Sequence, residues 1–87
     1  MSEKMKLKIS KAQSHALNQI RGLHERAHYM VMCAHRTPDG EFLIGTEEDF
    51  DHLLGDLYDE VEFEMQPKTA LRALSQLIHK LEPSDDF

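Results

Sequence analysis

The sequence has one cysteine and no long apolar run. These two features argue against a disulfide-stabilised protein and against a membrane-spanning protein. Cys33 has no second cysteine in the chain to pair with, so the cysteine usage favours the reducing cytoplasm. No apolar stretch approaches the ~20 residues that a membrane helix needs. The first charged residues are not followed by an apolar stretch, which argues against a signal peptide. We therefore expect a soluble, cytoplasmic protein with no membrane partner.

Glycine is sparse, and its placement argues against a phosphate-binding loop. The chain has four isolated glycines: Gly22, Gly40, Gly45 and Gly55. No Ser/His/Asp nucleophile elbow is present either. A thiolate activated by histidine would need Cys33 and His35 on one face, as in a strand, because residues two apart on a helix do not face each other. We therefore expect no enzymatic activity.

The chain is short and its charge is unevenly distributed. Its 87 residues fit one small domain, 1–87, with segments 1–4 and 83–87 expected to be frayed. Residues 1–38 carry a net charge of +5 and residues 39–87 a net charge of −11. We expect the basic half to pack beside the acidic half, and the acidic surface is a candidate docking site for a basic protein. The lysines and arginines are too spread out to predict nucleic-acid binding.

The first segment predicts a strand that leads into a helix. Residues 4–9 alternate lysine with apolar residues, which is typical of a half-buried strand. Ser10 and Gln13 then have the spacing of a capping box, in which each side chain bonds the backbone N–H of the other residue. Ile9, just before the cap, is placed to act as a hydrophobic staple.

An apolar stripe predicts one long helix over 10–35. Its members step by three or four residues: Ala12, Ala16, Ile20, Leu23, Ala27, Met30 and Ala34. The stripe resembles a heptad seam, which favours an antiparallel helix hairpin or a dimer contact. A rival interpretation ends the helix near Ala27 and makes 28–34 a strand.

The second half predicts a turn and two further helices. Residues 36–41 contain the Pro-Asp-Gly signature of a turn, and 41–45 are expected to be extended and to pair with 5–9. Thr46 is placed to cap a helix over 46–65, although 60–65 also alternates as a strand would. Pro67 breaks that element and suits the first turn of a helix over 67–82.

The predicted fold class is mainly α, a three-helix bundle with a short two-stranded β ribbon. The alternative is a ferredoxin-like α+β fold. In that fold 28–34 and 41–45 form a hairpin, and 60–65 is a strand beside 4–9.

Histidine gives the sharpest candidate site. His24 and His28 are four residues apart, so on one helix they share a face and suit a divalent transition metal. His35 lies near the same face but about 10 Å further along the axis. The residues considered as further ligands lie on the next helix: Asp51, His52, Asp56 and Glu60. Histidines on a polar flank beside the core explain the same pattern without metal.

These patterns favour a non-enzymatic protein-interaction module that self-associates, with a homodimer expected through the stripe or through Tyr29 and Met30. One alternative is a small metal-binding or metal-sensing protein that uses His24 and His28. Another is an accessory subunit of an enzyme. No motif in the sequence identifies a family.

Overall fold

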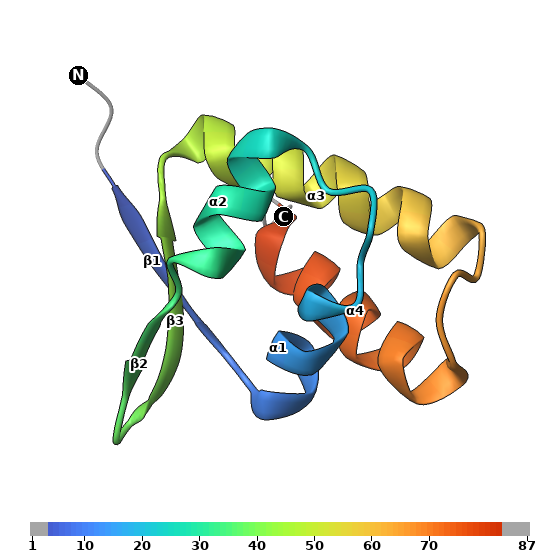
Figure 1. Ribbon diagram of the computed structural model, residues 1–87, viewed down its shortest axis with the longest axis horizontal. Helices are drawn as coiled ribbons and strands as arrows, with labels where there is room; N and C mark the ends of the chain where they lie inside the picture. Colours follow the sequence, from blue (N-terminus) through green and yellow to red (C-terminus); the bar gives the residue numbers. More distant parts are fainter. Residues whose placement is uncertain (1–3, 83–87) are drawn as a thin grey trace, which may run out of the picture.

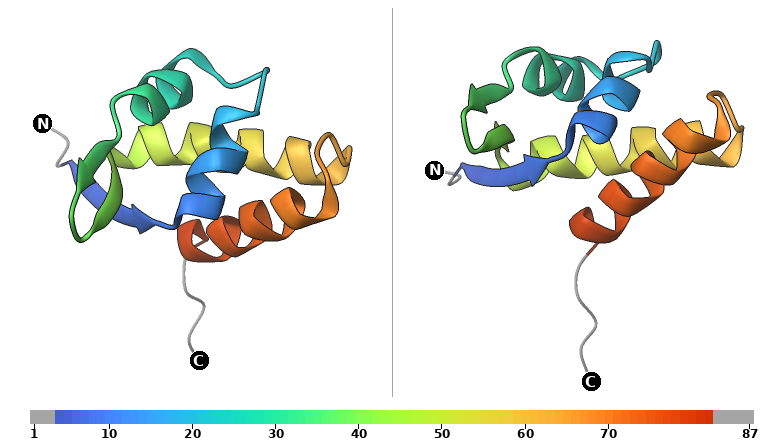
Figure 2. Two further views of the ribbon diagram at one scale, coloured as in Figure 1. Left: turned by 60° about the horizontal axis from the view of Figure 1, so that its bottom comes forward. Right: turned by 90° about the horizontal axis from the view of Figure 1, so that it is seen from below.

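The computed structural model describes residues 4–82, which form a three-stranded antiparallel sheet at one end of the molecule and four helices beside it (Figures 1 and 2). In chain order the elements are β1 (Met5–Ile9), α1 (Lys11–Asn18), α2 (Glu25–Met32), β2 (His35–Thr37), β3 (Gly40–Gly45), α3 (Glu47–Glu62) and α4 (Lys68–Leu81). The mostly helical character is confirmed, because the described residues are 58% helical. The fold as a whole is a small α+β globule with a larger sheet than expected.

The predicted ribbon is confirmed and carries an additional strand. Strand β3 lies in the centre, with β1 and β2 antiparallel on either side. In the register Met5 pairs with Gly45 and Ile9 with Glu41. Strand β2 differs from the sequence prediction, which places residues 35–37 at a helix end and in a turn. Gly40 closes the hairpin at φ 141°, a backbone conformation that favours glycine.

The single helix predicted over 10–35 is wrong, and the segment forms α1 and α2 with an irregular stretch between them. The Ser10–Gln13 capping box is present at the start of α1. The chain then leaves the helix after Asn18, and α2 begins only at Glu25. A long-range hydrogen bond holds the start of α2: the His24 N–H donates to Asp56 Oδ2 at 2.7 Å. The bundle therefore has four helices instead of three.

The alternative strand assignments are also wrong. Most of 28–34 lies in α2, which runs to Met32, and the hairpin forms instead from 35–37 and 40–45. Residues 60–62 are the last turn of α3, and β1 pairs with β3 instead of with 60–65. The ferredoxin-like arrangement is therefore excluded for residues 4–82.

The two C-terminal helices agree with the sequence prediction. Thr46 and Asp49 form a complete capping box at the start of α3. Pro67 is the N-cap of α4, as its fixed φ and missing N–H allow. Between the helices, Gln66 Nε2 donates to Glu60 Oε2 at 2.7 Å and to Ala16 O at 3.1 Å. These bonds tie the α3–α4 connection to α1.

The core lies between the inner face of the sheet and the four helices. Helix α1 packs on α4, α2 on α3, and α3 on α4. The fully buried side chains of largest volume are leucines: Leu17, Leu43, Leu53, Leu57, Leu74 and Leu77. Ala16, Ile20, Ala27 and Met30 of the predicted stripe are buried within the same chain. The stripe therefore packs against this chain's own core, although the helix that suggested it is broken.

Two expectations concern the ends of the chain and the membrane. The fraying predicted for 1–4 and 83–87 falls, apart from Lys4, outside the described residues. Among residues 4–82, every helix is too short or too polar to cross a bilayer.

Candidate functional site

The three histidines of the predicted metal face do not share one helix. His24 is the N-cap of α2, and its Nδ1 accepts from the Arg26 N–H at 3.2 Å. His28 lies within α2 and is exposed, whereas His35 begins β2. The helical spacing that suggested a shared face therefore holds only around the start of α2.

Helix α3 brings two of the expected additional ligands to His24. The His24 and His52 rings stack with their centroids 4.0 Å apart and their planes 3° apart. Asp56 accepts from the His24 backbone, as described above, and Glu60 bonds Gln66 instead. Within residues 4–82 no group of three or more His, Cys, Asp or Glu side chains is placed to hold a metal ion. Metal binding by His24 and His28 stays a prediction.

The start of α3 carries an electrostatic cluster beside α2. Arg26 lies 3.4 Å from Glu48 and 3.5 Å from Asp49. The Arg26 and Glu48 side chains are both more than half exposed, whereas Asp49 is 22% exposed. The Thr46 backbone N–H donates to Asp49 and holds the pKa of that carboxyl below its usual value, with a smaller contribution from Arg26. This cluster stabilises the start of α3 and needs no ligand to explain it.

The helices lie on one face of the sheet and leave its outer face uncovered (Figures 1 and 2). The alternation along each strand sends Ile9 and Leu43 inward, where both are buried. The cross-strand register places the remaining positions outward: Lys6, Lys8, His35, Thr37, Gly40, Phe42 and Ile44. We call these residues the outer sheet face.

The outer sheet face combines apolar and basic side chains. Phe42 and Ile44 are partly exposed at its centre. Lys6 Nζ lies 5.0 Å from the Phe42 ring centroid, a cation–π contact. The Lys8 side chain crosses Gly40 so closely that an added Cβ there would lie 2.8 Å from its Cε. Both lysines therefore spread across the central strand.

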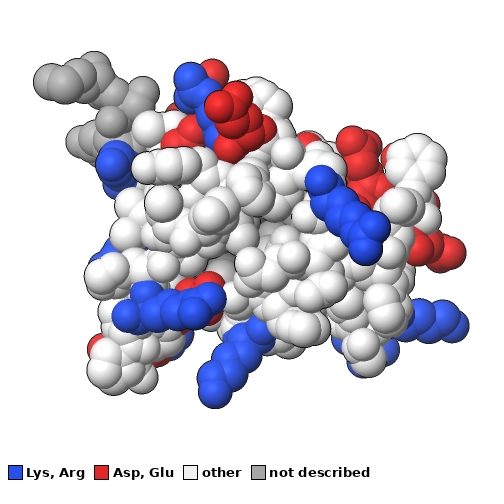
Figure 3. All heavy atoms as spheres, viewed as in Figure 1, with Lys and Arg blue, Asp and Glu red and all other residues white. Residues whose placement is uncertain are grey.

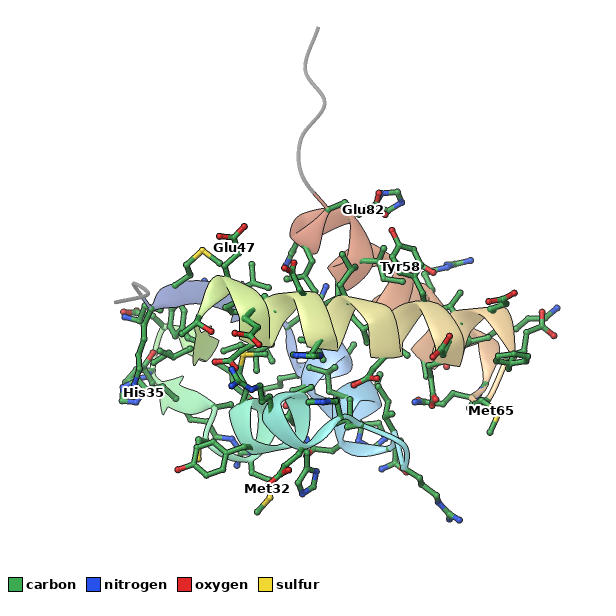
Figure 4. All side chains as sticks on the ribbon, turned by 90° about the horizontal axis from the view of Figure 1, so that it is seen from above. Met32, His35, Glu47, Tyr58, Met65 and Glu82 are labelled. Carbon is green, nitrogen blue, oxygen red and sulfur yellow. The ribbon has the colours of Figure 1, made fainter. Side chains whose placement is uncertain are left out.

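None of the outward positions holds an acidic residue. Glu41 points to the opposite face, where it accepts from Ser14 Oγ at 2.7 Å and lies 3.5 Å from Arg36. Figure 4 shows His35 at the sheet end of the molecule, directed away from the helices. In Figure 3 most acidic side chains lie along the upper and right margins of the face shown, where α3 lies, and a few acidic atoms are visible at the lower left beside the sheet.

A hollow of about 540 Å³ extends the outer sheet face towards α2. Its lining combines Ile44 and the exposed side chains of Tyr29 and Cys33 with charged residues of both signs. The charged residues are Lys4, Arg26, Glu25 and Asp49. Cys33 ends α2 and His35 begins β2, so the two residues belong to different elements. The hollow therefore places an aromatic ring and side chains of both charges next to Ile44.

The sequence predicts part of this surface. The lysine alternation over 4–9 indicates a strand with one polar face, and the expected pairing with 41–45 is observed. The partial exposure of Phe42 and Ile44 has no signal in the sequence, because an apolar residue in a strand gives no sign of which face the helices cover. Comparisons of the chain with family models, curated proteins and solved structures found no match in any of the three.

Proposed function

We propose that this protein is a non-enzymatic protein-interaction module whose binding surface is the outer sheet face. The observation that supports this proposal is the composition of the outer sheet face. It combines the partly exposed Phe42 and Ile44 with lysines and has no acidic residue, although the chain has a net charge of −6. Sheets in small domains commonly bury an apolar face against a second layer. Here the outer face has an apolar centre, but no second layer covers it among the described residues.

The composition of the outer sheet face suits a protein partner. Protein interfaces commonly have an aromatic or aliphatic centre surrounded by a polar rim. Lys6, Lys8 and His35 form such a rim around Phe42. A nucleic acid is a poorer fit, because few phosphates would be neutralised and the negative net charge of the chain would oppose the approach of a polyanion.

The test compares two double variants. Phe42→Ala/Lys6→Glu removes the aromatic centre and reverses one rim charge. The matched control, Tyr58→Ala/Arg72→Glu, makes the same types of change on exposed positions of α3 and α4. Proteins captured from the native host by the wild type are identified by mass spectrometry, and each purified partner is titrated against the three proteins.

We expect the outer-face variant to weaken binding of the partner by about tenfold or more, as loss of a central aromatic contact does. The control should bind as the wild type does. Thermal unfolding establishes that both variants are folded. Equal affinities for all three proteins would exclude the outer sheet face as the binding surface.

A further inference from the structure

The connection between α3 and α4 forms a second apolar surface of opposite charge. Phe63 and Met65 are 69% and 67% exposed and stand two residues apart in the chain, so two large apolar side chains are open to solvent at this one connection. Glu62 and Glu64 flank Phe63, and both are exposed. Glu64 has a φ of 48°, so the backbone turns sharply there. We call residues 62–65 the acidic turn.

The acidic turn and the outer sheet face lie at opposite ends of the molecule. Figure 4 shows Met65 at one end, pointing away from the helices, and His35 at the other. Figure 1 shows the same separation between the sheet and the α3–α4 connection. One molecule therefore cannot bring its own two surfaces together without unfolding.

We propose that the acidic turn of one molecule docks on the outer sheet face of a second copy. The two surfaces are complementary in charge, with Glu62 and Glu64 on one side and Lys6 and Lys8 on the other. Each also has an aromatic ring in contact with solvent, the exposed Phe63 or the partly exposed Phe42, so the contact would bury apolar area as well. This inference rests on the proposed function and names its partner.

Charge also argues against symmetric pairing. Two outer sheet faces would place lysines against lysines, and two acidic turns would place carboxylates against carboxylates. The stripe of α1 and α2 is not free for a dimer, because Ala16, Ala27 and Met30 are buried within the chain. Unlike surfaces therefore meet head to tail, which generates rings or open chains instead of a two-fold dimer.

The contact is small, so it is expected to be weak. A turn of four residues covers far less than the ~800 Å² per partner of a stable complex. We expect a dissociation constant on the order of 100 μM. At 1 M salt the Debye length is about 3 Å, so the attraction between the glutamates and the lysines is screened and the assembly should weaken.

The experiment is a charge exchange followed by sedimentation equilibrium. One variant, Lys6→Glu/Lys8→Glu, makes the outer sheet face acidic. The other, Glu62→Lys/Glu64→Lys, makes the turn basic, and its new lysines lie at the C-terminal end of α3, where the helix dipole favours them. Arg72→Glu on α4, outside both surfaces, is the control.

At about 1 mM, well above the expected dissociation constant, the wild type and the control should exceed the 10.1 kDa monomer mass. Each charge variant alone should remain monomeric, because its two surfaces then repel each other. An equimolar mixture should assemble again, since every surface regains an opposite partner. Monomeric wild type, assembly of either variant alone, or a mixture that stays monomeric would each overturn the proposal.

Failure of self-assembly leaves the proposed function separately testable. If the wild type is monomeric and the Phe42→Ala/Lys6→Glu variant still loses a captured partner, the outer sheet face binds a different protein. If the outer-face variant keeps that partner as well, both proposals are wrong.

Discussion

Segments 10–35 and 46–65 carry similar apolar patterns, yet only the second forms one continuous helix. Both begin with a capping box, at Ser10 and Thr46, and both contain a glycine near the middle. The first segment breaks into α1 and α2, whereas α3 runs unbroken over 16 residues. Neither periodicity nor glycine therefore decides whether a helix continues.

Tertiary contacts explain the difference. After α1, Ile20 turns into the core outside any helix, and Asp56 of α3 bonds the backbone N–H of His24. Helix α3 is the element against which α2 and α4 pack, so its apolar face is covered along its length. A buried stripe can thus arise from a broken segment when long-range contacts direct each residue inward.

The largest expected effects are on stability, and they should be greater for charges introduced into the core faces of α3 and α4 than for a charge in the interrupted segment 10–35. Leu57→Asp and Leu74→Asp each place an unpaired charge at a site with 0% exposure, and both should unfold the domain. Leu23→Asp should leave a folded protein of lower stability, because Leu23 is only partly buried in the stretch between α1 and α2. Circular dichroism during thermal unfolding measures all three.

A folded Leu57→Asp variant would show that the α3 face is assigned wrongly. Unfolding by Leu23→Asp as complete as that by Leu57→Asp would show that the interrupted stretch contributes to the core as fully as α3 does.

The two capping boxes should differ in their response to acid. Ser10→Ala and Thr46→Ala should each lower the free energy of unfolding by about 1 kcal/mol near neutral pH. The pKa of Asp49 is lowered in the folded state, so its contribution is present above its unfolded pKa and is lost as pH falls through the lower folded value. Gln13, the corresponding residue of the first box, does not titrate.

Urea unfolding at pH 7 and pH 3 measures this difference. The cost of Thr46→Ala should shrink at pH 3, whereas the cost of Ser10→Ala should change little. Equal costs at both pH values for Thr46→Ala would mean that the Asp49 carboxylate adds nothing to the cap.

The glycines in the middle of the two segments, Gly22 and Gly55, should differ in how much an alanine substitution raises the stability. Gly55 lies within α3, and no neighbouring atom comes within 4 Å of the point where an added Cβ would lie. Gly55→Ala should therefore raise the free energy of unfolding by about 1 kcal/mol. Gly22 has equal space but lies outside a helix, so Gly22→Ala should gain about half as much through the unfolded chain alone. A larger gain at Gly22 in denaturant titrations would indicate that alanine lets α1 continue.

Much of this fold could be predicted from local signals. Thr46 and Pro67 mark the starts of α3 and α4 because caps and proline act on their nearest neighbours. The interruption between α1 and α2 could not be predicted. The bond that holds the start of α2 joins the His24 N–H to Asp56, which is 32 residues further along the chain. The outer sheet face could not be predicted for a related reason: the sequence shows two faces of a strand but not where the helices will pack.

The smallest expected effect concerns metal, where we expect no tight binding. Nitrogen lone pairs lie in the imidazole plane, so the parallel His24 and His52 rings do not direct them at one ion. His24 Nδ1 is also engaged by the Arg26 N–H, and a metal at that atom would cost the α2 cap about 1 kcal/mol. Calorimetry with zinc at pH 7.5 should therefore show no site tighter than about 10 μM.

The contrary result has a distinct signature. A stoichiometric site would strengthen as pH rises, because protons must leave the imidazoles before metal binds. His28→Ala should abolish such a site, whereas His79→Ala on α4, an exposed control, should not. That outcome would mean that the start of α2 rearranges around the ion, so that the interrupted segment carries function while the continuous helix beside it supports the core.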